Sequence, residues 1–103
     1  MIIQLIVFLM IQNPFVEVIE KNQFMSLIYE GHKLIDVRSP EEYKDGHIYG
    51  SQNININSID FINEIQKLDN KDTILVYCRS GRRSLYASQV MVAFGFKKIY
   101  DLK

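Results

Sequence analysis

The sequence is poor in the residues that build cross-linked or metal-bound domains, because its 103 residues include a single cysteine, Cys78. One cysteine excludes an internal disulfide, a Cys-x-x-Cys redox pair and a zinc site made from several cysteines. The two histidines, His32 and His47, are too few and too scattered to indicate a metal site. We therefore predict neither a bound metal nor a cofactor.

The chain also lacks an excess of charge of either sign. Twelve Lys and Arg residues balance twelve Asp and Glu residues, so the formal net charge is zero. General nucleic-acid binders need a basic surface, and this balance argues against a nucleic-acid partner. Any preference for a charged substrate has to come from a local cluster of charges.

The longest apolar run, residues 1–11, is too short to cross a bilayer, which needs about 20 residues. It lacks the preceding Lys or Arg and the following small-residue cleavage site of a signal peptide. We predict no stable membrane span and a cytoplasmic location, with export or membrane association through residues 1–11 as the alternative. Residues 1–14 are taken as an apolar extension, and residues 15–103 as one domain, because this length supports one core.

Short apolar runs alternate with helical patterns along the rest of the chain. Strands are expected at residues 15–19, 33–37, 52–56, 73–77 and 98–102. This alternation predicts a parallel sheet with helices on both faces. Active sites in such folds lie at the carboxyl ends of the strands. Cys78 directly follows the run 73–77, which is where a catalytic residue is expected.

Capping residues predict where the helices begin. Ser39, Pro40 and Glu42 form the pattern of a capping box, and Gly46 is expected to end that short helix. Asn22 is expected to cap the helix before it, and Asn57 or Ser58 the helix after it.

Apolar spacing predicts which helical residues are buried. The third helix is expected to bury Phe61, Ile62, Ile65 and Leu68. The last helix is predicted over residues 84–94, with Ala87, Val90, Met91 and Phe94 on its inner face. Gly95 is expected to cap it in the left-handed conformation, so that Phe96 folds back on Met91.

Three features of residues 78–83 favour a reactive thiolate at Cys78. The cysteine precedes a helix N-terminus, where free N–H groups and the helix dipole favour an anion. Three arginines, Arg79, Arg82 and Arg83, lie within five residues of it. Gly81 allows a tight turn in which successive N–H groups point inward. The thiolate is the nucleophilic form, and such a loop needs no histidine base to generate it.

The alternative for Cys78 is a buried structural cysteine, which is the usual state of a lone cysteine. We favour the reactive thiol, because the polar and cationic flanking sequence is unfavourable in a core. For Arg79 and Arg82 the alternative is that they are solvent-exposed surface residues without a role in binding an anion. Arg83 and the loop N–H groups are the stronger candidates for binding an anion.

Two motifs in register resemble the rhodanese-like sulfurtransferase family. The first is Cys-x-x-Gly-x-Arg at residues 78–83, between a strand and a helix. The second runs over residues 36–51 and reads Asp-Val-Arg, then Glu-Tyr, then Gly-His-Ile, then Gly-Ser. The resemblance covers about residues 15–103, in the family's order and spacing.

The resemblance implies an α/β fold with a five-stranded parallel sheet flanked by helices. From the resemblance we also expect the family's Gly-Gly step and closing C-terminal helix, which would follow the last strand, to be missing here. The resemblance also implies that Cys78 is the catalytic residue and becomes a persulfide. The substrate-binding loop carries over to Arg79, Ser80, Gly81, Arg82 and Arg83.

Four residues of the second motif are interpreted more cautiously. Asp36 and Arg38 either brace the loop or form an ordinary ion pair, and we favour the ion pair. His47 is expected to fix the turn after Gly46, and Glu42 needs no role beyond the capping box.

The implied reaction moves a sulfane sulfur from a donor such as thiosulfate to a thiol or cyanide-like acceptor, including a protein thiol. A non-catalytic rhodanese-like binding module is the main alternative, because fold does not fix function. A cysteine-dependent phosphatase is a weaker alternative. Its His-Cys-x5-Arg motif would place Arg where this chain has Ser84. The oligomeric state is left open.

Overall fold

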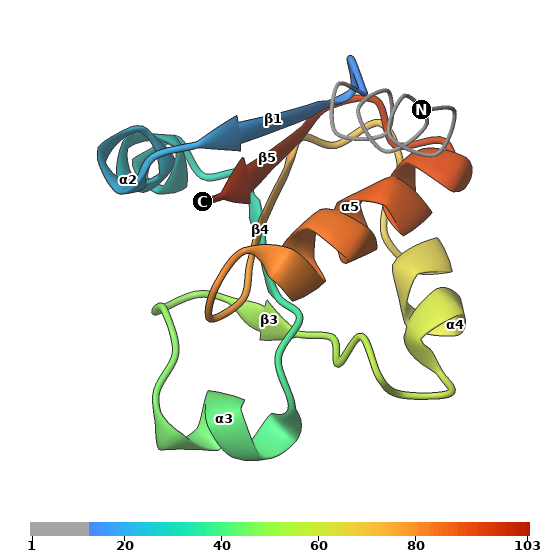
Figure 1. Ribbon diagram of the computed structural model, residues 1–103. Helices are drawn as coiled ribbons and strands as arrows, with labels where there is room; N and C mark the ends of the chain where they lie inside the picture. The colour runs from blue at the N-terminus through green and yellow to red at the C-terminus, as the bar shows by residue number, and fades with distance from the viewer. Residues whose placement is uncertain (1–12) are drawn as a thin grey trace, which may run out of the picture.

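The computed structural model describes residues 13–103, which form five strands and four helices (Figure 1). The strands are β1 (Val16–Ile19), β2 (Lys33–Asp36), β3 (Gln52–Asn53), β4 (Ile74–Tyr77) and β5 (Ile99–Leu102). The helices are α2 (Lys21–Tyr29), α3 (Pro40–Asp45), α4 (Phe61–Gln66) and α5 (Arg82–Ala93). Each predicted strand is present, and β4 is buried along its whole length.

All five strands are parallel and follow the order β1-β5-β4-β2-β3. This arrangement confirms the predicted parallel sheet. The strand predicted over residues 52–56 is shorter than expected, because only Gln52 and Asn53 pair with β2. Beyond them the chain turns over the end of β2, where Ile54 N–H donates to Asp36 O and Ile56 N–H donates to Val37 O.

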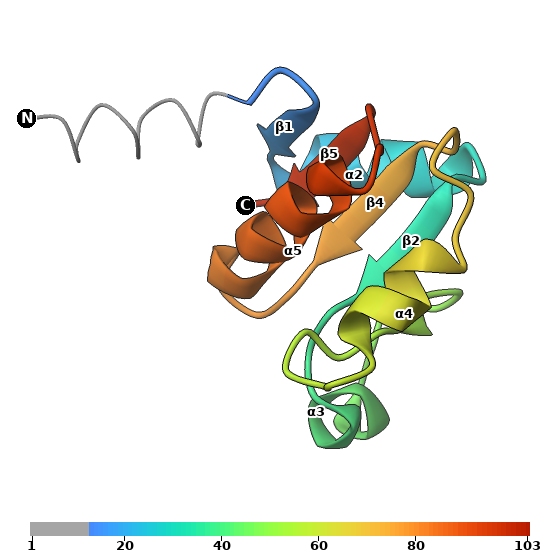
Figure 2. The same ribbon diagram turned by 90° about the vertical axis from the view of Figure 1, so that its right-hand side faces the viewer.

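Helices cover both faces of the sheet, as predicted (Figure 2). Helices α4 and α5 pack on the face that carries Ile35, Ile74 and Val76. Helix α2 packs on the other face, where Phe24 lies against Leu34 and Leu75 in the second apolar cluster. The two clusters bury both faces of the central strand β4, as expected of a central strand in a parallel sheet.

The capping predictions are confirmed in part. The Ser39 side chain accepts from Glu42 N–H, and the Glu42 carboxylate accepts from Ser39 N–H, so the capping box is present. Asn22 is not a cap, because α2 already begins at Lys21 after Glu20. Helix α4 follows Asp60, and Ser58 instead accepts a hydrogen bond from Asp60 N–H in the preceding turn.

Two buried-face predictions are wrong, because Ile62 and Phe94 are exposed. Both lie near the edge of the apolar stripe, where spacing alone does not decide which residues face inward. Helix α5 begins two residues earlier and ends one residue earlier than predicted. The turn after it is as predicted, since Gly95 has a φ of +95° and Phe96 N–H donates to Met91 O at 3.1 Å.

Within residues 13–103, no helix is long and apolar enough to cross a membrane. The described range also holds no group of three or more His, Cys, Asp or Glu side chains able to hold a metal ion. Residues 1–11, on which the export or membrane-association alternative rests, lie outside the described residues. The domain boundary at residue 15 stays a prediction.

Candidate active site

The carboxyl ends of β2 and β4 meet at one edge of the sheet (Figure 2). Asp36 pairs in register with Tyr77, and Val37 N–H donates to Tyr77 O at 3.2 Å. Cys78 follows Tyr77 at this edge, and the chain then turns into α5. The fold therefore places Cys78 beside the Asp36–Arg38 segment, although the two are about forty residues apart in sequence.

The sulfur of Cys78 is held by hydrogen bonds from the turn that follows it. Gly81 N–H donates to Sγ at 3.1 Å, and Ser84 N–H donates to Sγ at 3.3 Å. The Ser84 hydroxyl lies 3.4 Å from Sγ and accepts from the thiol. An ionised sulfur would keep the two N–H donors and could also accept from this hydroxyl.

Sγ takes the place of a side-chain cap for α5. Gly81 is the N-cap residue and has no side chain to satisfy the first N–H groups of the helix. Ser84 is the third residue of the helix, and its N–H is one that a cap normally satisfies. The helix N-terminus and its partial positive charge are therefore directed at the sulfur.

Burial raises the pKa of Cys78, but the hydrogen bonds outweigh it and the pKa is lowered overall. The lowering comes from the Ser84 hydroxyl and from backbone N–H groups of Ser84, Ser80 and Gly81. This direction agrees with the predicted thiolate, but the donors are mostly backbone groups rather than arginine side chains.

Cys78 is 9% exposed and belongs to the apolar cluster beneath α5. The expectation that its polar flanks keep it out of the core is therefore wrong. The buried strand β4 leads directly into it. The chain then passes through the exposed Arg79 and Ser80 and turns back, so that Gly81 and Ser84 contact the sulfur. Polar neighbours in sequence do not place a residue at the surface when the chain turns there.

The three arginines of the loop differ in their environments. Arg83 forms a bidentate ion pair with Glu42, with Nη1–Oε1 and Nη2–Oε2 distances of 2.7 and 3.0 Å. Glu42 raises the pKa of Arg83, and the Cys78 charge raises it further. The paired guanidinium holds the pKa of Glu42 at about 2. Arg79 and Arg82 are exposed.

Glu42 therefore does more than complete the capping box, contrary to the sequence-based interpretation. Its ion pair joins the start of α3 to the start of α5 across 41 residues of sequence. Such a long-range contact leaves no local signal in the sequence.

Asp36 and Arg38 form a buried ion pair beside Tyr77. Arg38 Nη2 and Nε donate to Asp36 Oδ2 at 2.7 and 3.0 Å, and Arg38 N–H donates to Oδ1 at 2.9 Å. Arg38 Nη2 also donates to Gly46 O at 2.6 Å. These bonds tie the end of β2 to the turn after α3. A role of the pair in supporting the loop stays a prediction.

His47 lies in the turn that Arg38 holds. Its Nδ1 is 2.7 Å from Tyr43 O, and its ring stacks on the Tyr43 ring at a centroid distance of 3.6 Å. These contacts fit the expected part of His47 in fixing the turn.

Ser84 and Asp101, two buried polar residues, are absent from the site predicted by the sequence. In the sequence Ser84 marks only the predicted start of a helix and a mismatch to the phosphatase motif. Asp101 lies on β5 and is 1% exposed. The alternation of side chains along a strand could have found it, since Asp101 faces the same side as the core residue Ile99.

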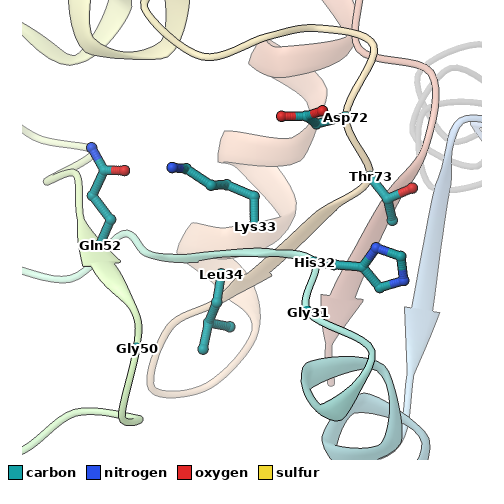
Figure 3. Close-up of a pocket in the computed structure, with 8 residues that line it drawn as sticks. All are labelled: Gly31, His32, Lys33, Leu34, Gly50, Gln52, Asp72 and Thr73. Carbon is teal, nitrogen blue, oxygen red and sulfur yellow. The ribbon is translucent and has the colours of Figure 1, made fainter.

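A cavity of about 310 Å³ lies at the opposite edge of the sheet (Figure 3). It is lined by residues that precede or begin β2, β3 and β4, including Lys33, Gln52 and Asp72. A second cavity, of about 440 Å³, adjoins the Cys78 loop and is lined in part by Ile56, Arg82, Arg83 and Tyr86. Of these two cavities, the second is the one that includes residues of the Cys78 loop.

Comparison with known proteins identifies the family. The model of the rhodanese-like domain matches residues 20–103. The chain belongs to the rhodanese-like family. Its predicted fold class is thereby confirmed, and thiosulfate sulfurtransferases are among its relatives.

Two relatives and one solved structure illustrate the similarity of this rhodanese-like chain. Thiosulfate sulfurtransferase 18 of Arabidopsis thaliana is 33% identical, with 82% of this chain and 71% of the relative covered. A putative mitochondrial thiosulfate sulfurtransferase of Schizosaccharomyces pombe is 39% identical over 64% of this chain and 54% of its own length. A rhodanese-related protein of Thermoplasma volcanium has a TM-score of 0.74 and 26% identity, covering 84% of this chain and 83% of the other.

Replacement of Gly81 by alanine is expected to weaken both the fold and the hold on the sulfur. Gly81 has a φ of +86°, which costs a residue with a side chain about 1–2 kcal/mol. If the turn relaxes, its N–H moves away from Sγ, and the pKa of Cys78 rises. Urea unfolding and the pH dependence of thiol alkylation measure the two effects.

Gly31→Ala is the matched control, because Gly31 also has a φ of +86° but lies after α2, away from the loop. We expect a similar loss of stability without a change in the thiol. An identical alkylation profile in the two variants would contradict a role of the Gly81 N–H.

Proposed function

We propose that this protein is a sulfurtransferase that carries sulfane sulfur as a persulfide on Cys78. The observation that carries the proposal is the set of donors around Sγ. The N–H groups of Gly81 and Ser84 and the start of α5 all face the sulfur. They favour a negative charge there, and both the thiolate and the persulfide are anions at neutral pH.

The first step forms one bond and breaks one bond. The Cys78 thiolate attacks the outer sulfur of a donor such as thiosulfate, forming the new S–S bond of the persulfide. The S–S bond of thiosulfate breaks, and sulfite leaves with the electron pair. In the second step the acceptor, a thiolate or cyanide, attacks the outer sulfur, and Cys78 leaves as the thiolate. No external oxidant or reductant is needed.

The charged residues of the loop suit an anionic donor. Arg79 and Arg82 are exposed beside the sulfur-holding turn, and Arg83 is held in place by Glu42. Ser80 and Gly81 supply the backbone of the turn. The cavity of about 440 Å³ beside Arg82 and Arg83 is the proposed site where the donor and then the acceptor approach. Cations and N–H groups in a concave site bind an oxyanion with good geometry.

Intact mass spectrometry of the full chain tests the proposal. Incubation with thiosulfate is expected to add about 32 Da, the mass of one sulfur, to Cys78. Cyanide should then restore the original mass and release thiocyanate. Cys78→Ser is expected to show neither change, and turnover of thiosulfate by this variant would exclude the mechanism.

The same preparation distinguishes the alternatives. Hydrolysis of a phosphotyrosine mimic without sulfur transfer would favour a cysteine-dependent phosphatase and overturn the proposal. Inertness to both reagents in a folded protein would favour a non-catalytic binding module. The burial of Cys78 is consistent with that alternative.

A further inference from the structure

Asp101 is a buried acid that the fold does not explain. It is 1% exposed, and its register neighbours are Val18 on β1 and Val76 on β4. Its Oδ1 atom has no hydrogen-bond partner among residues 13–103. A buried polar atom without a partner is costly and calls for a functional or structural reason.

Two buried serines of α5 accompany Asp101 beneath the helix. Ser84 and Ser88 lie one turn apart and are fully buried. The Ser88 hydroxyl donates to Ser84 O at 2.8 Å and is therefore already committed. The Ser84 hydroxyl contacts the sulfur at 3.4 Å, and Ser84 is the one side chain whose hydrogen bonding affects the carboxyl of Asp101 among the described residues. Burial raises the pKa of Asp101 to about 7, and hydrogen bonding with the Ser84 hydroxyl opposes part of this rise.

The Ser84 hydroxyl has one hydrogen to donate and three neighbours that can take it. It now donates to Gly81 O at 3.2 Å while accepting from the Cys78 thiol at 3.4 Å. When the thiol loses its proton, Sγ becomes an acceptor, and the hydroxyl can turn its hydrogen toward the sulfur. The protonation state of Asp101 decides whether this rotation of the Ser84 hydroxyl is favoured. A neutral carboxyl can donate a hydrogen bond to Ser84, whereas a carboxylate can only accept one.

We propose that Asp101 is a positioning residue for Cys78. Its protonated carboxyl donates to Ser84 Oγ and turns the Ser84 hydrogen toward Sγ, whereas the carboxylate takes that hydrogen for itself. This proposal deepens the proposed function and rests on it, since it assigns a residue that favours the anionic sulfur. It makes the Asp101 carboxylate and the Cys78 thiolate compete for a single hydroxyl hydrogen.

Among the described residues, those placed around Asp101 on the neighbouring strands and on α5 carry no charge. The neighbouring strands present Val18 and Val76, and α5 presents the two serines. Arg83, the charged residue next to Ser84, is paired with Glu42. The loop also packs against the end of β5, since a Cβ added at Gly81 would lie 3.6 Å from Leu102 O. A change of charge on β5 is therefore close to the turn that holds the sulfur.

The decisive variant is Asp101→Asn, tested by the pH dependence of alkylation with iodoacetamide and read by intact mass. The amide carries no charge at any pH, and its N–H groups can donate to Ser84 as the protonated carboxyl does. We expect the variant to be alkylated like the wild type below about pH 7, where Asp101 is protonated. Above that pH the variant should be alkylated up to about tenfold faster, because the pKa of Cys78 no longer rises by about one pH unit when Asp101 ionises. The wild-type profile should be broadened near pH 7, where Asp101 ionises, and that of the variant should follow a single ionisation.

Two controls make the result specific. Asp72→Asn neutralises an exposed acid at the opposite edge of the sheet and should leave the profile unchanged. Ser84→Ala removes the connecting hydroxyl, so Asp101→Asn should have little further effect in that background. Ser84→Ala alone should also lose the broadening near pH 7, which provides a test if Asp101→Asn does not fold.

A wild-type profile in Asp101→Asn would overturn the proposal, as would a shift that persists undiminished in Ser84→Ala. Alkylation needs no sulfur transfer, so the two proposals fail separately. If Asp101→Asn changes the alkylation profile but thiosulfate forms no persulfide, the proposed function is contradicted and the link between Asp101 and Cys78 is supported. If a persulfide forms but the profile does not change, the proposed function is supported and the link is contradicted.

Discussion

Asp36→Ala is expected to destabilise the domain by about 3–5 kcal/mol, because it leaves a largely buried guanidinium without its carboxylate. The Asp36 side chain is fully buried, and that of Arg38 is 16% exposed. Both carboxylate oxygens accept from Arg38, through the guanidinium and through the backbone N–H. Domains of this size have about 5–15 kcal/mol of stability in total, so a large part would be lost. Urea unfolding at neutral pH measures it.

Glu64→Ala is the matched control for Asp36→Ala. Glu64 also pairs with a cation, Lys67, but the two side chains are 39% and 71% exposed. We expect a change within about 0.5 kcal/mol, since water screens such a pair. In the double variant Asp36→Ala with Arg38→Ala, the loss should be smaller than the sum of the single losses. A loss near the control value for Asp36→Ala would show that the buried pair contributes little.

The sequence predicts the parts of the fold that depend on neighbours along the chain. Residues 73–77 are β-branched and apolar, and a run of this kind has few stable alternatives to a buried strand. Ser39, Pro40 and Glu42 act within one helical turn, so their spacing is sufficient to predict the capping box. The turn after Cys78 is equally local, which is why the donors from its backbone could be expected.

The rest of the site depends on contacts between distant segments. Nothing within a few residues of Glu42 indicates that it pairs with Arg83, because the contact exists only once α3 and α5 meet at the same edge. The burial of Cys78 was missed for a related reason. Its exposure is set by how the loop closes over it, whereas flanking residues describe only the composition of the loop.

Asp101 provides the second large effect, an unusual dependence of stability on pH. Burial raises the pKa of Asp101 to about 7 in the folded protein, whereas an unfolded chain ionises near the ordinary value of about 4. Between these limits the folded state holds a proton that the unfolded state has lost, so stability falls as the pH rises. The loss is about 1.4 kcal/mol per pH unit, and it ends above about pH 7, where the folded state is also ionised.

Asp101→Asn removes this dependence, because the amide does not titrate. We expect the variant and the wild type to differ least at pH 5, and the variant to be more stable by a few kcal/mol at pH 8. Urea unfolding of both proteins from pH 5 to 8 gives the difference directly. Glu42, with a pKa of about 2, is already ionised throughout this range in the folded state, and His32 and His47 are common to both proteins. Parallel curves of stability against pH for the two proteins would contradict this prediction. They would mean that ionisation of Asp101 does not destabilise the folded state, because the carboxylate then contacts water or a hydrogen-bond donor.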